Sequence, residues 1–249
     1  MWRRVYDLIQ ANAPYDPNDL SFSACLWRIE TVHGLKANAA ANVVEMVIAG
    51  FETSAGAISW ALYDIASIPE VQAKLHAELK TAGLLQSDGK EGRPVIWEDL
   101  ALPYLNAVIK ESARINPVAS QGTIRTTEQD TAMGGYWVPK GAMVFVQLNS
   151  VHNSIWNWDD PLSFKPERWL EGGSGNDNPA YIPFSMGPRS CVGQNMAWVT
   201  VRVVLLELFS KLRFKADPRM GSREDVRVNQ VMSLTLKHQG GIWLIPEKL

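Results

Sequence analysis

The sequence has little cysteine, no strong excess of one charge and no long uninterrupted apolar run. Only Cys25 and Cys191 occur among 249 residues, and two unpatterned cysteines do not make the disulfide framework of a small secreted domain. A formal net charge of −2 provides no basic surface field, so nucleic-acid binding is not indicated. The most apolar window, residues 46–68, is interrupted by Glu52 and Asp64 and is not predicted to span a membrane.

Targeting segments and internal repeats are also missing. The arginines near the N-terminus are followed by polar residues and not by a signal-like apolar run. What is present is an ordinary globular composition, with 46% hydrophobic and 20% charged residues, in a chain long enough to bury a core. We therefore expect a globular chain that, as written, is soluble or peripherally attached to a membrane.

Helical patterns dominate the chain, with short β-rich pieces between them. Four helices are predicted, at 35–68, 69–82, roughly 102–115 and about 194–212. Glycine-punctuated β segments lie within 117–149 and in the C-terminal tail, and an irregular meander rich in tryptophan and proline covers 154–179. The predicted fold is mainly α with small β-sheets, and because the linkers are short we expect a single domain over 1–249.

The second cysteine lies in the loop I-P-F-S-M-G-P-R-S-C-V-G at 182–193. Cys191 comes just before a predicted helix, whose unpaired N–H groups and positive dipole end favour a thiolate. The loop glycines permit positive φ and a close approach of a large flat group to the backbone. Arg189 offers a cation for a carboxylate. A lone cysteine is usually an inert buried side chain, so the spacing of the whole loop carries the interpretation.

The ten residues F-S-M-G-P-R-S-C-V-G match the pattern Phe-x-x-Gly-x-Arg-x-Cys-x-Gly, and the chain therefore resembles the cytochrome P-450 family. The resemblance implies that Cys191 is the axial ligand of the iron of haem b, iron protoporphyrin IX. It also implies that Arg189 binds a haem propionate. It further implies that Phe184 packs beside the ligand loop and that Gly187 and Gly193 let the loop fit beneath the macrocycle.

The predicted long helix contains A-G-F-E-T-S at 49–54, which is similar to the family's Ala-Gly-x-(Asp/Glu)-Thr segment. A glycine inside a helix costs about 1 kcal/mol relative to alanine, and the polar pair that follows it interrupts an apolar run. An exposed polar stripe is the simpler interpretation of such a pair. The resemblance implies instead that Thr53 and Glu52 are catalytic residues that deliver protons to iron-bound dioxygen.

Two further segments, K-E-S-A-R and F-K-P-E-R-W, resemble the family's Glu-x-x-Arg and Pro-Glu-Arg-Phe elements. Glu111 and Arg114 share a helix face because they are three residues apart. The resemblance implies a structural charge network of these two residues with Arg168, which would hold the meander near the cysteine loop. Trp169 replaces the usual phenylalanine, and Arg125, in T-I-R-T-T, corresponds to a second propionate partner.

These resemblances imply a monooxygenase that inserts one atom of dioxygen into a small, apolar organic substrate, with residues 118–123 and 232–233 facing that substrate. Electrons would come from NADPH through a reductase or a ferredoxin-type partner. The similarity covers only the C-terminal portion of the family fold: the long central helix, the Glu-x-x-Arg helix, the meander and the cysteine loop. We therefore expect a fragment, because a half-covered apolar pocket would expose a large patch. The absent N-terminal part would anchor a eukaryotic form in the endoplasmic reticulum membrane.

Four alternatives stay open at this point. The chain could be a truncated, non-catalytic fragment, or a haem-thiolate isomerase or dehydratase, although Glu52 and Thr53 favour dioxygen activation. A cysteine hydrolase would use Cys191 as nucleophile and His152 or His238 as base, but no orienting acid is evident. A zinc site at Cys25 and His33 lacks companions at ligand spacing.

Overall fold

The structure is a computed structural model that describes residues 16, 18–21, 24–25, 27–29, 39–85 and 92–249. It divides into two compact units, residues 1–52 and 53–249, and the single-domain organisation expected from the sequence stays a prediction. The first residues of the helix expected at 35–68 lie outside the described residues. All residues predicted for the haem site and the charge network except Glu52 belong to the second unit.

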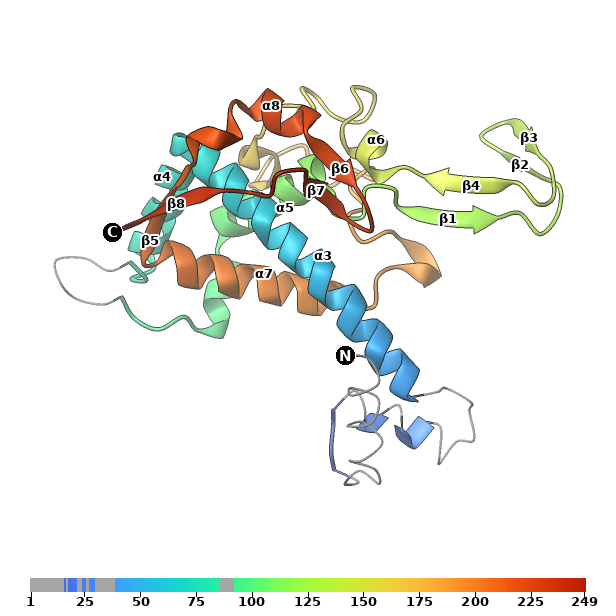
Figure 1. Cartoon of the computed structure of the whole chain (residues 1–249), viewed down its shortest axis with the longest axis horizontal. Helices are drawn as coiled ribbons and strands as arrows, with labels where there is room; N and C mark the ends of the chain where they lie inside the picture. Colours follow the sequence, from blue (N-terminus) through green and yellow to red (C-terminus); the bar gives the residue numbers. More distant parts are fainter. Residues whose placement is uncertain (1–15, 17, 22–23, 26, 30–38, 86–91) are drawn as a thin grey trace. The chain divides into compact units, whose positions relative to one another are not determined.

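Four helices supply the core of the second unit (Figure 1). They are α3 (Ala39–Ser67), from Thr53 onward, α4 (Pro69–Thr81), α5 (Pro103–Ile115) and α7 (Gln194–Phe209). A proline in the first turn starts both α4 and α5, where its missing N–H costs no helical hydrogen bond. The largest apolar cluster draws fully buried side chains from all four helices: Ile65, Leu75, Leu79, Leu105, Leu205 and Phe209.

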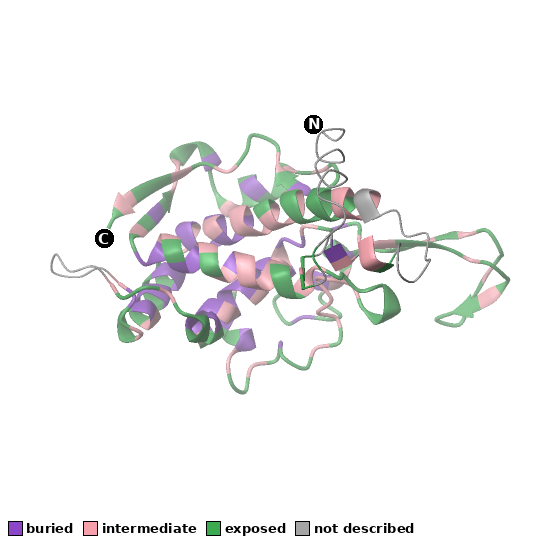
Figure 2. Cartoon of the chain, turned by 90° about the horizontal axis from the view of Figure 1, so that it is seen from below, coloured by how far each residue is buried: buried purple, intermediate pink, exposed green. Residues whose placement is uncertain are grey.

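The strands of the described residues form four two-stranded antiparallel sheets. The pairs are β1 (Thr123–Thr126) with β4 (Met143–Val146), β2 (Thr131–Met133) with β3 (Tyr136–Val138), β5 (Leu212–Ala216) with β8 (Leu244–Lys248), and β6 (Gln230–Met232) with β7 (Leu236–His238). Gly134 and Gly135 join β2 to β3 with φ of 56° and 85°, the backbone that a two-residue hairpin turn requires. Within the second unit, the β1–β4 ribbon projects from the helices and is mostly exposed (Figures 1 and 2).

The second unit also contains short helices: η1 (Trp97–Ala101), α6 (Leu148–His152), η2 (Pro166–Trp169), η3 (Gly187–Arg189), η4 (Pro218–Met220) and α8 (Arg223–Val228). No helix of the described residues is both long enough and apolar enough to cross a bilayer. The long helices and the four two-stranded sheets confirm the predicted fold, mainly α with small β-sheets.

Two local predictions need correction. The helix expected at 194–212 ends at Phe209, because Leu212 already pairs with Lys248 in the β5–β8 sheet. Helix α8 was not predicted, although Ser222 and Asp225 form a capping box at its start and the spacing S-x-x-D was a readable signal for it.

Candidate functional site

The cysteine loop is a tight backbone structure that ends at the first turn of α7. The amide of Cys191 donates to the carbonyl of Phe184 at 2.9 Å, and the amide of Ser185 donates to the carbonyl of Ile182 at 2.9 Å. Ser185 and Gly187 have φ of 62° and 76°, a left-handed conformation that glycine adopts without strain. These contacts place the thiol just before α7, where helix N–H groups favour negative charge.

The surface around the thiol is open and apolar. Cys191 is exposed, and Met186 and Val192 of the same loop are 67% and 79% exposed. Among the described residues, a Cβ atom added to Gly187 would meet no atom within 4 Å, and one added to Gly193 would approach only the Cys191 Sγ, at 3.9 Å. The backbone therefore leaves room for a large flat group to lie against the loop. Such a group would cover apolar side chains that are exposed to solvent in its absence.

Two arginines lie exposed on the elements that carry this surface, namely Arg189 in the loop and Arg125 in β1. Arg125 Nη1 donates only to the neighbouring Ile124 carbonyl, at 2.8 Å, and no carboxylate pairs with either arginine in the part of the chain that the structure describes. A contact of 3.1 Å between Thr123 Oγ1 and Ser185 Oγ joins β1 to the loop. Both cations are thus available to carboxylates of a bound group.

The aromatic side chain of the loop anchors it to α7. The Phe184 ring packs edge-to-face on Trp198, with 5.0 Å between ring centroids. The sequence does not predict this role of Trp198, because its contact with Phe184 depends on how the loop folds back onto α7. Phe184 thus fixes the loop to the helix that follows it, and its part in holding a cofactor stays a prediction.

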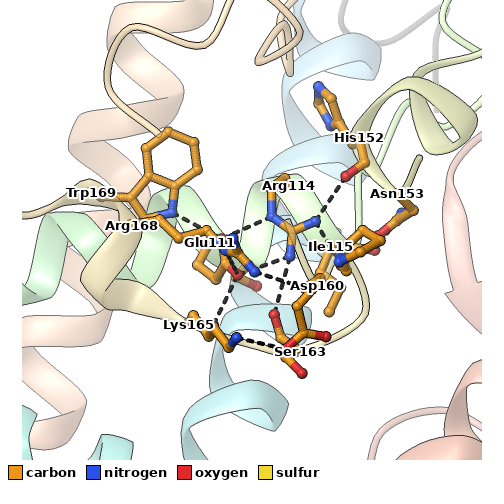
Figure 3. Close-up of polar contacts among 12 residues, drawn as sticks. Glu111, Arg114, Ile115, His152, Asn153, Asp160, Ser163, Lys165, Arg168 and Trp169 are labelled. Atoms are coloured by element: carbon orange, nitrogen blue, oxygen red, sulfur yellow. Dashed lines mark hydrogen bonds and ion pairs between the residues drawn. The ribbon is translucent and has the colours of Figure 1, made fainter. Parts of the chain in front are cut away.

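Glu111, Arg114 and Arg168 meet in a buried ion cluster (Figure 3). Glu111 and Arg114 are both 0% exposed, and Arg114 donates to the Glu111 carboxylate from Nε at 2.9 Å and from Nη2 at 2.8 Å. Arg168 Nε lies 3.3 Å from Glu111 Oε1. The structure therefore brings together the three charges that the sequence placed in one network.

Trp169 belongs to this cluster as well. Its Nε1 donates to Glu111 Oε2 at 3.0 Å, a bond that phenylalanine cannot make. The Lys165 amide also donates to Glu111, at 2.9 Å. The sequence shows that tryptophan replaces phenylalanine here, but it does not show the hydrogen bond to Glu111, because the two residues are 58 positions apart.

Replacing Trp169 with phenylalanine is expected to lower the free energy of unfolding by about 1.5–3 kcal/mol more than the loss of ring area alone, because a hydrogen bond to a buried charge is lost. Trp158→Phe is the matched control. Trp158 is also buried, but its Nε1 has no hydrogen-bond partner among the described residues. Denaturant unfolding of both variants measures the difference, and equal destabilisation would contradict the assigned bond.

Glu52 and Thr53 are successive half-buried residues of α3. Glu52 is the last residue of the first compact unit, and Thr53 is the first residue of the second. A Cβ at Gly50, two residues before Glu52, would meet no atom of the described residues within 4 Å. Their catalytic role stays a prediction.

The two segments expected to face a substrate lie against each other and against α3. A Cβ at Gly56 would come within 3.2 Å of Val118 Cγ1, so the helix approaches the 118–123 segment at a glycine. Ser120 Oγ lies 3.0 Å from Met232 Sδ, and the Leu236 amide donates to the Val118 carbonyl at 2.8 Å. The segment after α5 and the β6–β7 hairpin are therefore held side by side.

The structure does not support the two other sites considered from the sequence, a cysteine-hydrolase site and a zinc site. His152 Nε2 accepts the Ile182 amide at 3.0 Å, and His238 Nδ1 lies 2.8 Å from the Gly241 carbonyl. Neither ring bonds to Cys191 among the described residues, so no hydrolase-type pair of thiol and base is formed. His33 lies outside the described residues, which contain no group of three or more histidine, cysteine or acidic side chains that could hold a metal ion.

Comparison with known proteins identifies the family. The family model described as Cytochrome P-450 matches residues 10–242, and this chain belongs to the cytochrome P-450 family. It is 33% identical over 199 residues to cytochrome P-450 2J1 of Oryctolagus cuniculus and 34% identical over 202 residues to cytochrome P-450 4F3 of Rattus norvegicus. Each alignment covers 80% of this chain and 38% or 36% of the relative.

A third relative and a solved structure also match this chain. The mitochondrial 25-hydroxyvitamin D-1 alpha hydroxylase of Homo sapiens is 34% identical over 177 residues, which cover 71% of this chain and 34% of that protein. A crystal structure of the cytochrome P-450 CYP102L1 superposes with a TM-score of 0.82 and 27% identity, over 100% of this chain and 55% of that one. The chain thus has part of the P-450 fold, and it spans about a third of the length of these curated relatives.

Proposed function

We propose that this chain is the haem-binding portion of a monooxygenase that inserts one atom of dioxygen into a small, apolar organic substrate. The observation that carries the proposal is the exposed Cys191 thiol, held just before α7 in an open apolar loop. Membership of the P-450 family supports it, as does a relative that is named a hydroxylase.

Residues of the cysteine loop and of β1 would hold haem b in this proposal. Cys191 Sγ would bind the iron, and Arg189 and Arg125 would pair with the propionates. Gly187 and Gly193 keep side chains away from the macrocycle. When bound, the haem supplies an iron at which dioxygen is activated, and a thiolate ligand favours cleavage of the O–O bond.

The remaining steps are assigned to other parts of the chain and to partners. The Glu52 carboxylate and Thr53 Oγ1 would hold and pass on the protons that the reaction takes up. The presence of an acid and a hydroxyl at these positions favours dioxygen activation over peroxide rearrangement. Residues 118–123 and 232–233 contact the substrate. Electrons come from NADPH through a reductase or a ferredoxin-type partner, and an anchored eukaryotic form would reside in the endoplasmic reticulum membrane.

The ligand assignment is tested by adding haem to the purified chain, reducing it and adding carbon monoxide. We expect the Soret band of a thiolate-bound haem, its loss in Cys191→Ala, and its retention in Cys25→Ala, which removes the other cysteine. The same band after Cys191→Ala would refute the assignment of the ligand. A wild-type chain that takes up no haem would refute haem binding by this chain.

A further inference from the structure

His152 lies between the ion cluster and the cysteine loop and contacts both. It ends α6 and is 0% exposed. Its backbone carbonyl accepts a hydrogen bond from Arg114 Nη1 at 2.8 Å (Figure 3). Its ring Nε2 accepts one from the Ile182 amide at 3.0 Å. One residue therefore joins the cluster to the first peptide of the loop.

The direction of the second bond determines the protonation of the ring. Because a backbone amide can only donate, Nε2 must be unprotonated, and the proton of the neutral ring must be on Nδ1. Nδ1 is buried and has no hydrogen-bond partner among the described residues. Burial first and the Arg114 charge second lower the pKa of His152 to about 4, so the ring is a neutral acceptor at neutral pH.

A chain of backbone bonds leads from Ile182 to the thiol. The Ile182 carbonyl accepts the Ser185 amide, and the Phe184 carbonyl accepts the Cys191 amide, both at 2.9 Å. The His152 ring also stacks on Tyr181, the residue before Ile182, with 5.8 Å between centroids. Releasing the Ile182 amide would thus loosen the turn that closes on Cys191.

We propose that His152 is a positioning residue for the cysteine loop, acting as an obligatory hydrogen-bond acceptor for the Ile182 amide. The part of this proposal that concerns an iron ligand rests on the proposed function, whereas the part that concerns the loop backbone does not. A purely space-filling histidine would be replaced well by phenylalanine and poorly by glutamine. An acceptor would show the reverse order, because glutamine Oε1 reaches about as far as imidazole Nε2.

The experiment compares His152→Phe with His152→Gln in the haem-free full chain, with backbone amide hydrogen exchange as the readout. We expect His152→Phe to raise the exchange rates of the Ile182 and Cys191 amides about tenfold or more, since a buried donor loses its partner. His152→Gln is expected to stay within about threefold of wild type. The Phe214 amide, which donates to Gln72 Oε1, is the internal control and is expected to be unchanged in both variants.

Two results would overturn the proposal: unchanged exchange at Ile182 in His152→Phe, or glutamine protecting the loop no better than phenylalanine. Should His152→Phe not fold, ¹⁵N NMR of the wild-type imidazole decides, because a proton on Nε2 would rule out the accepted bond. None of these measurements needs haem, so a failure of haem binding would leave this result intact. With haem added, His152→Phe is expected to reduce the thiolate-type Soret band, and His152→Gln to retain it.

Discussion

Replacing Glu111 with glutamine is expected to lower the free energy of unfolding by about 3–5 kcal/mol, which is a large part of the stability of an ordinary domain. The glutamine has nearly the same shape but no charge. It would leave the Arg114 and Arg168 guanidinium groups buried without the carboxylate that now accepts from both. The Lys165 amide and Trp169 Nε1 also donate to this carboxylate, so the change weakens the link between α5 and the meander.

Chemical denaturation of the purified chain measures this loss. Glu224→Gln is the matched control, since Glu224 pairs with Arg227 across three residues but both side chains are well exposed, at 65% and 47%. Exposed pairs contribute little, and we expect a change below about 1 kcal/mol in the control. A Glu111→Gln chain as stable as the control would show that the cluster does not hold the fold together.

The second large effect is a pH dependence that comes from His152. Its pKa is about 4 in the folded chain against an ordinary value of 6.5, so the unfolded state takes up a proton at a higher pH than the folded state. Stability is therefore complete above pH 6.5 and falls as the pH drops towards 4. A difference of about 2.5 pH units corresponds to roughly 3 kcal/mol.

Unfolding free energies of wild type and His152→Gln between about pH 7 and pH 4 isolate this contribution, because glutamine does not titrate. The comparison is needed since other groups titrate in the same range. Burial raises the pKa of Asp64, so that carboxyl takes up its proton first in the folded state and stabilises the chain as the pH falls. We expect the advantage of wild type over the variant to shrink steadily with acidification. A difference that does not vary with pH would contradict the buried neutral ring.

Much of the local structure was readable from the sequence because its causes are local. Proline at the start of α4 and α5 and the glycine pair between β2 and β3 act through their own backbone preferences. The early end of α7 was not readable in the same way. Leu212 leaves the helical pattern because it pairs with Lys248, and that partner comes from the far end of the chain.

The candidate site shows the same division. The spacing of residues 184–193 determined by itself that a thiol, a cation and two glycines lie together before a helix, because every contact that closes this loop joins residues fewer than ten positions apart. Only the tertiary structure decided what holds the loop in place: the bond from Thr123 to Ser185, the ring of Trp198 and the imidazole of His152. His152 and Ile182 are 30 residues apart, and whether they meet depends on how the end of α6 packs against Tyr181 and the start of the loop, which no local pattern specifies.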